Sequence, residues 1–293
     1  MSGSEPTKDY QRYGRQKRAG RGRTLLWLAI IVVLVAAAGL ALARGQFSGD
    51  STPVASDTNT LPIQSLLIRE GLRREDIAAL LDKETGISGA AYLAATAPGP
   101  RGRALAKTSK PTSLEGFLFP ATYDITSRTT AKDLVDFQIK AYKDNTANID
   151  YSYARSKNLT KFDVLIIASM IEREVALPRE RRIVAGVIYN RLKARMRLDI
   201  DATTQYAIGE WKPELTAADL ATRSPYNTRL YTGLPPGPIS NPGIDSIAAA
   251  AHPARHRFLY YVARNDGTEG HYFAATPAQF EKDVARSRAN AGR

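Results

Sequence analysis

The sequence predicts an α+β protein that follows one N-terminal membrane segment, and three observations lead to this fold class. An uncharged, apolar run near the start is long enough to cross a bilayer. Beyond it, most apolar residues recur at helical spacing, and several of these stretches begin with a capping residue. A few short apolar stretches beside proline or glycine turns predict strands, and the last two predict a small antiparallel hairpin.

Residues 24–43 are predicted to be a transmembrane helix, because about twenty uncharged residues span the ~30 Å hydrocarbon layer. The preceding tail, residues 1–23, carries seven basic residues against two acidic ones, so the positive-inside rule places it in the cytoplasm. The rest of the chain is then extracytoplasmic. A cleaved signal peptide is the alternative, since residues 41–43 resemble a cleavage site. The apolar region of a signal peptide is usually only ~7–15 residues long, which favours a retained anchor.

The formal net charge is +12, and half of it lies in the tail and at Arg44. On an exported domain, the remaining basic excess favours anionic envelope polymers or lipid head groups over nucleic acid. A solvated surface rich in lysine and arginine is an equal alternative. The chain has no cysteine, so the fold rests on its core and not on disulfides.

Residues 44–61 are small, polar and contain proline, which predicts a flexible linker. A small α+β module is predicted over residues 62–125. It has helices over residues 74–85 and 88–95, a loop over 98–111, and short strands at 117–119 and 122–125.

A second, mainly helical domain is predicted over residues 126–293. Thr160 and Asp163 match a capping box before a helix that ends at Val175, and Pro178 suits the first position of the next helix. Other predicted helices cover residues 131–143, 202–208 and 217–222. A loop rich in proline and glycine covers residues 224–243, a hairpin joins 258–264 to 271–275, and Thr276 opens a final helix.

Two carboxylates, Glu172 and Glu174, lie at the end of the otherwise apolar helix that ends at Val175. Both lie on apolar stripes of the helical wheel, so periodicity cannot choose between them. They could emerge at the helix end and form surface ion pairs with nearby arginines, as many carboxylates do. Alternatively, one of them faces a cleft whose apolar walls keep it protonated, so that it acts as a general acid.

Several motifs, in this order, resemble the endolytic murein transglycosylase (YceG-like) family. They are LEGFLFPATYDI (114–125), IASMIEREV (167–175), VIYNRLKARMRLDIDATTQY (187–206), SPYNTRLYTGLPPGPISNPG (224–243), AAAAHPA (248–254) and GHYF (270–273). The resemblance covers roughly residues 62–285. It implies a single-pass plasma-membrane enzyme that cleaves nascent peptidoglycan, with a LysM-like module over residues 62–125 and a catalytic domain over 126–293.

The resemblance further implies that Glu172 is the catalytic acid and that Glu174 and Asp201 support it. The implied substrate-binding residues are Thr203, Tyr206, Tyr226, Asn227, Gly233, Leu234, Pro235 and Asn241. For those of these residues that lie in the loop over 224–243, a purely structural role is an equal alternative, because proline and glycine alone would fix the loop. The chain departs from the family pattern at Ala202, which replaces a proline, and in a shorter region between the membrane segment and the LysM-like module.

The implied reaction needs only one carboxylate. The acid protonates the leaving oxygen of the β-1,4 bond after N-acetylmuramic acid, then accepts the proton of the C6 hydroxyl, which closes a 1,6-anhydro ring. A peptidoglycan hydrolase would need a second carboxylate and would use Glu172 and Asp201. A glycan-binding scaffold without catalysis is the non-enzymatic alternative.

The implied partners are peptidoglycan strands, the cell membrane and, as a candidate, peptidoglycan synthases; no nucleic acid and no cofactor is expected. His252 and His256 stand four residues apart, but they are not predicted to bind a metal ion. Pro253 directly follows His252, no glutamate lies between the two histidines, and the chain lacks cysteine. Ser169 has neither a nearby histidine nor a glycine turn, so a serine nucleophile is not predicted either.

Overall fold

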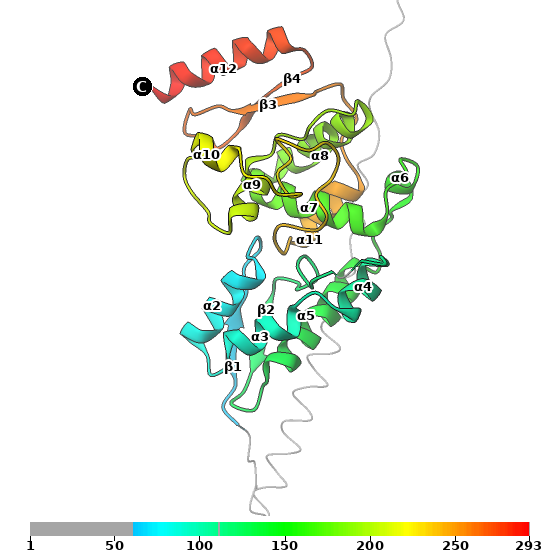
Figure 1. Cartoon of the computed structure of the whole chain (residues 1–293), viewed down its shortest axis with the longest axis vertical. Coiled ribbons are helices and arrows are strands. Elements are labelled where there is room, and N and C mark those ends of the chain that lie inside the picture. Colours follow the sequence, from blue (N-terminus) through cyan, green and yellow to red (C-terminus); the bar gives the residue numbers. More distant parts are fainter. Residues whose placement is uncertain (1–60, 111, 293) are drawn as a thin grey trace, which may run out of the picture. The chain divides into compact units, whose positions relative to one another are not determined.

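The structure, a computed structural model, describes residues 61–110 and 112–292, and Thr60–Arg293 form one compact unit. The predicted tail, the predicted membrane segment and all but the last residue of the predicted linker lie outside the described residues. Within the described ranges, no helix combines the length and the apolar composition that a membrane crossing requires. Helices dominate and two short antiparallel strand pairs accompany them, which confirms the predicted α+β class (Figure 1).

The first part of the described chain forms a small core around one strand pair. Its elements are β1 (Gln64–Leu67), α2 (Arg74–Glu84), α3 (Gly89–Thr96), α4 (Pro100–Ala106), β2 (Thr122–Ile125) and α5 (Ala131–Thr146). In the antiparallel pair, Leu66 lies opposite Tyr123, and both side chains are buried. Helix α3 packs against α2 and α5, so this first core extends past residue 125 into α5.

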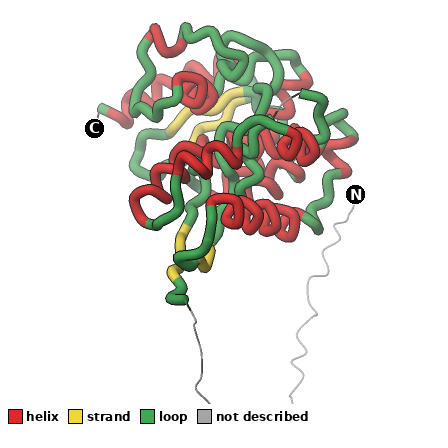
Figure 2. Tube along the Cα trace, turned by 60° about the horizontal axis from the view of Figure 1, so that its bottom comes forward, coloured by secondary structure: helices red, strands yellow, loops and turns green. Residues whose placement is uncertain are grey.

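The second part of the chain is built around α7. Its elements are α6 (Ser152–Arg155), α7 (Lys161–Glu174), α8 (Pro178–Lys193), α9 (Asp201–Ile208), α10 (Ala217–Leu220), α11 (Ile244–Ala251), β3 (Tyr260–Ala263), β4 (His271–Ala274) and α12 (Pro277–Ala291). Helices α8, α9 and α11 pack against α7, in which residues 164–171 are all buried. Helix α12 packs on the β3–β4 hairpin, and Figure 2 shows the two strand pairs at separate places among the helices.

Local signals explain where α7 and α8 begin. The Thr160 hydroxyl accepts the N–H of Asp163 at 3.1 Å, and the Asp163 carboxylate accepts the N–H of Thr160 at 2.7 Å. This is the predicted capping box, which satisfies two donors that the helix itself cannot pair. Pro178 occupies the first turn of α8, as predicted, where its missing N–H costs nothing.

Two local predictions are wrong, and three elements were not predicted. Residues 100–106 form α4 instead of a loop; a Cβ on Gly102 would lie 1.8 Å from the Thr112 carbonyl oxygen, so only glycine permits this close approach. Residues 117–119 lie at the end of a turn and form no strand, because the Phe117 N–H bonds the Leu114 carbonyl and the Leu118 N–H bonds a side chain. Strand β1 and helices α6 and α11 are the elements that were not predicted.

Asn241 joins the two parts of the described chain. Its side-chain oxygen accepts the N–H groups of Gly116 and Leu118 at 2.8 and 3.1 Å. Its side-chain nitrogen donates to the Leu72 carbonyl at 2.9 Å and to Glu115 Oε1 at 2.8 Å. The residue has no exposed surface, so these bonds replace those that water would make. The loop that carries Asn241 is therefore fixed against the first core.

Candidate active site

The end of α7 faces a cavity of about 580 Å³, and Glu174, the last residue of the helix, lines it. The other lining residues come from the segment around the start of α9, from α8, from the loop between α10 and α11, from the β3–β4 hairpin and from α12: Arg191, Leu198, Asp199, Asp201, Arg229, Tyr260, Tyr261, Val262, Ala263, His271 and Phe280. Charged and aromatic side chains thus share one concave surface, which suits a polar ligand that contains rings.

Burial raises the pKa of the Glu174 carboxyl, and the negative charge of Asp201 raises it further. Two hydrogen bonds oppose this rise: one from the Tyr261 hydroxyl, 3.1 Å from Oε2, and one from the backbone N–H of Ala202. The negative end of the α7 dipole also favours the neutral acid. A carboxyl group with a raised pKa stays protonated at a higher pH than an ordinary one, so it can donate its proton and later take it back.

Hydrogen bonds from arginine side chains hold the walls of the cavity. Arg229 donates from Nε to Asp201 Oδ1 at 2.5 Å. Arg191, which is largely buried, donates to the carbonyls of Leu259 and Leu198 at 2.6 and 2.7 Å. These bonds connect α8 to the residue before strand β3 and to the segment before α9, so the groups around Glu174 sit on a fixed framework.

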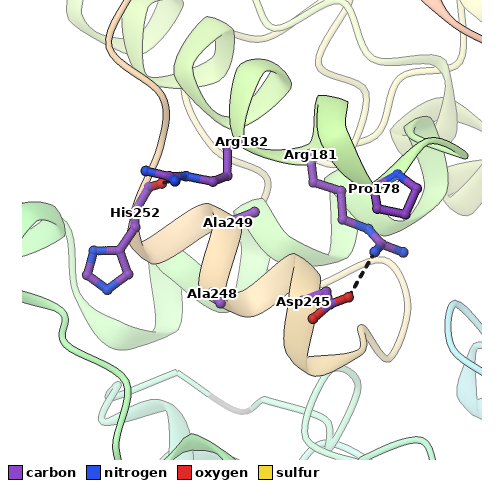
Figure 3. A pocket seen from close by; sticks show the side chains of 7 residues that line it. All are labelled: Pro178, Arg181, Arg182, Asp245, Ala248, Ala249 and His252. Carbon is purple, nitrogen blue, oxygen red and sulfur yellow. Dashed lines mark hydrogen bonds and ion pairs between the residues drawn. The ribbon is translucent and has the colours of Figure 1, made fainter. Parts of the chain in front are cut away.

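Glu172, the predicted catalytic acid, lies on the other side of α7. Its side chain is 7% exposed, its Oε2 accepts the Gly243 N–H at 3.0 Å, and its Oε1 lies 3.7 Å from Arg181 Nη2. Arg181 also contacts Asp245 at 3.3 Å, as Figure 3 shows, and Glu70 at 4.0 Å. The Glu172 carboxylate is therefore engaged inside the protein, and Glu172 does not line the cavity at the end of α7.

Glu174 lines this cavity and Glu172 does not, so Glu174 is a second candidate for the proton donor, and the catalytic role of Glu172 stays a prediction. Side chains two residues apart on a helix point roughly 200° apart, so only one of these two can face the cavity. Asp201 lines the cavity with Glu174. Glu172 and Asp201, the pair that the hydrolase alternative required, are not brought together at this cavity.

Three residues that were predicted to bind substrate, Thr203, Asn227 and Asn241, have no exposed surface. The Asn227 amide nitrogen donates to two backbone carbonyls, and its oxygen accepts two hydrogen bonds. The Thr203 hydroxyl lies 2.9 Å from that of Thr228. These side chains hold loops in place, and their complete burial does not support direct contact with a substrate.

Four of the other five predicted binding residues are more accessible. Tyr206 and Tyr226 are partly exposed, and their ring centroids lie 4.8 Å apart. Gly233 has a φ of +90°, a value that favours glycine, and Leu234 beside it is partly exposed, whereas Pro235 is buried. None of these five lines the cavity with Glu174, so substrate contact by them stays a prediction.

Sequence reasoning missed Tyr261, His271, Glu180, Arg191 and Arg229. His271 Nδ1 lies 2.7 Å from Glu180 Oε2, and the β3–β4 pairing brings Tyr261 and His271 to the same cavity. Three of these residues lie inside motifs that carried the family resemblance, but no spacing rule singles them out. In the described ranges, no group of histidine, aspartate and glutamate side chains is arranged to hold a metal ion.

Comparisons with known proteins agree with the motifs. The sequence model of the YceG-like family matches residues 49–286. A Streptococcus pneumoniae protein named endolytic murein transglycosylase is 39% identical over 178 residues, which is 59% of this chain and 32% of that protein. A Bacillus subtilis protein of the same name is 41% identical over 156 residues, 53% of this chain and 43% of that protein. The match thus spans less than half the length of either relative.

The fold also matches a solved structure. The crystal structure of a yceG-like protein from Listeria monocytogenes has a TM-score of 0.63 and 33% sequence identity to this chain. The match covers 74% of this chain and 75% of that one.

Proposed function

This chain belongs to the YceG-like family, and on that basis we propose that it is a lytic transglycosylase that cleaves peptidoglycan. The observation that carries the proposal is the position of Glu174, a carboxyl with a raised pKa at a cavity that can hold a sugar ring. The two relatives are named endolytic murein transglycosylase, and this name supports peptidoglycan as the substrate and cleavage at positions within its strands.

The proposed reaction uses Glu174 twice. As an acid, its carboxyl protonates the bridging oxygen of the β-1,4 bond, so that the bond from C1 of N-acetylmuramic acid to this oxygen breaks. The resulting carboxylate then removes the proton of the C6 hydroxyl of the same sugar, and O6 bonds to C1. The product carries a 1,6-anhydro ring, Glu174 regains its proton, and no water is consumed.

Neighbouring groups fit these two states of Glu174. The Tyr261 hydroxyl and the Ala202 N–H stabilise the carboxylate between the two proton transfers. Asp201, paired with Arg229, supplies negative charge near the positive, oxocarbenium-like sugar. Glu172 contributes by fixing α7 to Gly243 and Arg181.

We also propose a membrane topology and a role for the first module. Residues 24–43 anchor the protein once in the plasma membrane, with residues 1–23 in the cytoplasm and the catalytic part outside, where it could work beside peptidoglycan synthases. The composition of these segments supports this topology. Residues 62–125 then act as a LysM-like module.

Protease digestion of spheroplasts tests this topology. Protease added to the outer face should digest the C-terminal part and spare a tag at Met1. Release of a soluble form lacking residues 1–43 would contradict the anchor.

The central test compares two matched substitutions on purified peptidoglycan. Glu174→Gln keeps the shape of the side chain but cannot release a proton, so we expect cleavage to fall by about 10²–10⁴-fold. Glu172→Gln keeps an acceptor for the Gly243 N–H and does not change the lining of the cavity, so its activity should stay within about tenfold of wild type. Mass spectrometry of wild-type digests should show new ends as 1,6-anhydro-N-acetylmuramic acid.

Each other outcome has a definite meaning. Loss of activity in Glu172→Gln with full activity in Glu174→Gln would restore the roles that the sequence predicted. New reducing ends, heavier than the anhydro ends by one water, would assign hydrolysis, with Asp201 as the second carboxylate. A folded wild-type protein that produces no new ends would favour a glycan-binding scaffold.

A further inference from the structure

Three cavities lie in a row along α8, and adjacent ones share lining side chains. The first, of about 450 Å³, lies beside the start of the helix and is lined by Arg181, Arg182 and His252, the residue after α11 (Figure 3). The second, of about 520 Å³, shares Arg182 and His252 with the first. The third, of about 410 Å³, lies beside the end of α8 and shares Tyr153 with the second. We call this row of cavities the α8 groove.

The α8 groove follows the whole helix. Pro178, the first residue of α8, lines the cavity at one end, and Lys193, the last residue, lines the cavity at the other. At 1.5 Å per residue, the sixteen residues of α8 span about 24 Å. No lining residue of the groove lines the Glu174 cavity. The groove is therefore a separate surface, and its length suits a segment of a polymer better than a single small molecule.

Basic side chains line the groove. Arg255 lines the second cavity, and Lys157 and Lys193 line the third. All three are exposed, and within the described ranges none of them forms an ion pair. In the same ranges, Asp245 is the only acidic residue of the lining, and it is paired with Arg181. The unpaired positive charges can therefore bind anionic groups of a ligand.

The third cavity also offers aromatic surface. The rings of Tyr153 and Tyr189 lie 5.6 Å apart between centroids, and two leucines line the same cavity. The Tyr189 hydroxyl donates to the Ala250 carbonyl at 2.9 Å, which holds its ring in place. Lys157 Nζ lies 5.3 Å from the centroid of Tyr153. A ring of the ligand and a negative group beside it would thus find their partners at one place.

We propose that the α8 groove binds the part of a peptidoglycan strand that extends away from the cleavage site. Carboxylates of the stem peptides pair with Lys157, Lys193 and Arg255, and a sugar ring of the strand packs on Tyr153. This inference rests on the proposed peptidoglycan substrate, but not on which carboxylate of α7 donates the proton. Anionic lipid head groups lie at a flat membrane surface, whereas this groove is long and recessed, so the strand is the better match.

Binding outside the cleavage site has a kinetic consequence. Contacts with a distant part of the strand are the same before and during bond cleavage, so they lower KM and leave kcat almost unchanged. Substrates too short to reach the groove lose these contacts. The groove should therefore matter for long strands and not for short fragments.

Two matched triple variants test the proposal. The groove variant combines Lys157→Gln, Lys193→Gln and Arg255→Gln. The control variant removes the same charge at exposed positions outside the groove, by Lys143→Gln, Lys282→Gln and Arg128→Gln. Both are made in the full-length protein in detergent micelles, and circular dichroism should show both folded.

Binding is measured with soluble, uncross-linked strands, in a background of Glu172→Gln with Glu174→Gln that keeps the strands intact. The loss of three exposed ion pairs should raise the Kd of the groove variant about 5–30-fold at low salt and that of the control variant about twofold or less. Strands without stem peptides carry fewer carboxylates and should show a smaller difference. In the active background, KM for long strands should rise in the groove variant by a similar factor, with kcat unchanged.

A second measurement locates the ligand directly. Full-length protein with the same two glutamines, in phosphatidylcholine nanodiscs, is treated with an amine-reactive label and analysed by mass spectrometry. Adding strands should remove most of the labelling of Lys157 and Lys193 and leave that of Lys143 and Lys282 unchanged. The same protection in phosphatidylglycerol nanodiscs without strands would assign the groove to lipid head groups and overturn the proposal.

The remaining outcomes separate this inference from the function on which it rests. Active wild type together with a groove variant that binds and cleaves long strands like wild type would overturn the groove and leave the transglycosylase proposal intact. Equal weakening in the groove and control variants would do the same, because only the total charge would then matter. Wild type that neither cleaves nor binds strands would overturn both proposals.

Discussion

Replacing Glu115 by glutamine is expected to stabilise the protein near and above neutral pH. Glu115 is 1% exposed and accepts hydrogen bonds from Asn241 Nδ2 at 2.8 Å and from the Arg74 backbone N–H at 3.3 Å. Neither donor is charged. Burial, followed by the negative charge of Glu75, raises the pKa of the Glu115 carboxyl to about 8. The folded protein therefore holds a proton there that the unfolded chain releases at a much lower pH.

The size of the effect follows from this difference in proton binding. Below pH ~4.5, both states of the chain are protonated at Glu115 and the raised pKa costs nothing. Between that pH and about 8, only the unfolded chain releases the proton, so each pH unit lowers the free energy of unfolding by about 1.4 kcal/mol. The cumulative cost is about 3 kcal/mol at pH 7 and nearly ~5 kcal/mol above pH 8.

Glutamine does not titrate and so removes this cost. Its oxygen can still accept from Asn241, but its amide nitrogen faces the Arg74 N–H, which costs about 1 kcal/mol for one unmade hydrogen bond. We therefore expect Glu115→Gln to be more stable than wild type by about 2 kcal/mol at pH 7 and by more at pH 8. Below pH ~5 the difference should vanish or change sign.

Urea unfolding followed by circular dichroism at pH 5, 6, 7 and 8 would measure this difference. Other carboxyls with raised pKa values, such as Glu174, affect both proteins equally, so the difference isolates Glu115. Glu84→Gln, the same substitution at an exposed position, serves as the control and should follow wild type. A Glu115→Gln protein with the pH dependence of wild type, or one less stable than wild type at pH 8, would refute the reasoning.

Three further predictions concern other contacts. Tyr261→Phe removes a hydrogen bond that lowers the pKa of Glu174, so the pH–rate profile on peptidoglycan should shift its alkaline limb upward; an unmoved limb would contradict the contact. Asn241→Ala leaves several buried donors and acceptors unpaired and should lower the free energy of unfolding by about 3–5 kcal/mol, measured in urea. Gly186→Ala places a Cβ 2.4 Å from His256 Nε2, so melting curves should show a loss of about 1–3 kcal/mol, and an unchanged midpoint would argue against that close packing.

The elements that the sequence predicted are those with local causes. Helix α7 begins at a reciprocal capping box, and Thr160 and Asp163 lie only three residues apart. Strand β1 has no such signal, because only one of its four residues is buried and its partner, β2, lies more than fifty residues further along the chain. Helix α4 forms where Gly99 and Gly102 suggest a loop, and its position depends on the close approach of Thr112.

The same division applies to the site. The sequence identifies the helix that carries both candidate acids, because two carboxylates end an apolar run. It cannot decide between Glu172 and Glu174, since both lie on apolar stripes. Groups from other parts of the chain distinguish the two carboxylates. The Gly243 N–H and Arg181 bind Glu172, whereas the Tyr261 hydroxyl donates to Glu174. Only the tertiary structure brings these groups to opposite sides of one helix.

The position of Asn241 also limits how this protein can be cut or recombined. Residues 62–125 look like an exchangeable module, yet Gly116, Leu118 and Leu72 all place backbone groups on one amide of the later loop. A truncated chain that began at residue 126 would expose the amide of Asn241 and the apolar side of α5, and it should be recovered mainly in inclusion bodies. Chimeras with relatives should tolerate exchange of residues 1–60 better than exchange at residue 125, because Thr60–Arg293 form one compact unit.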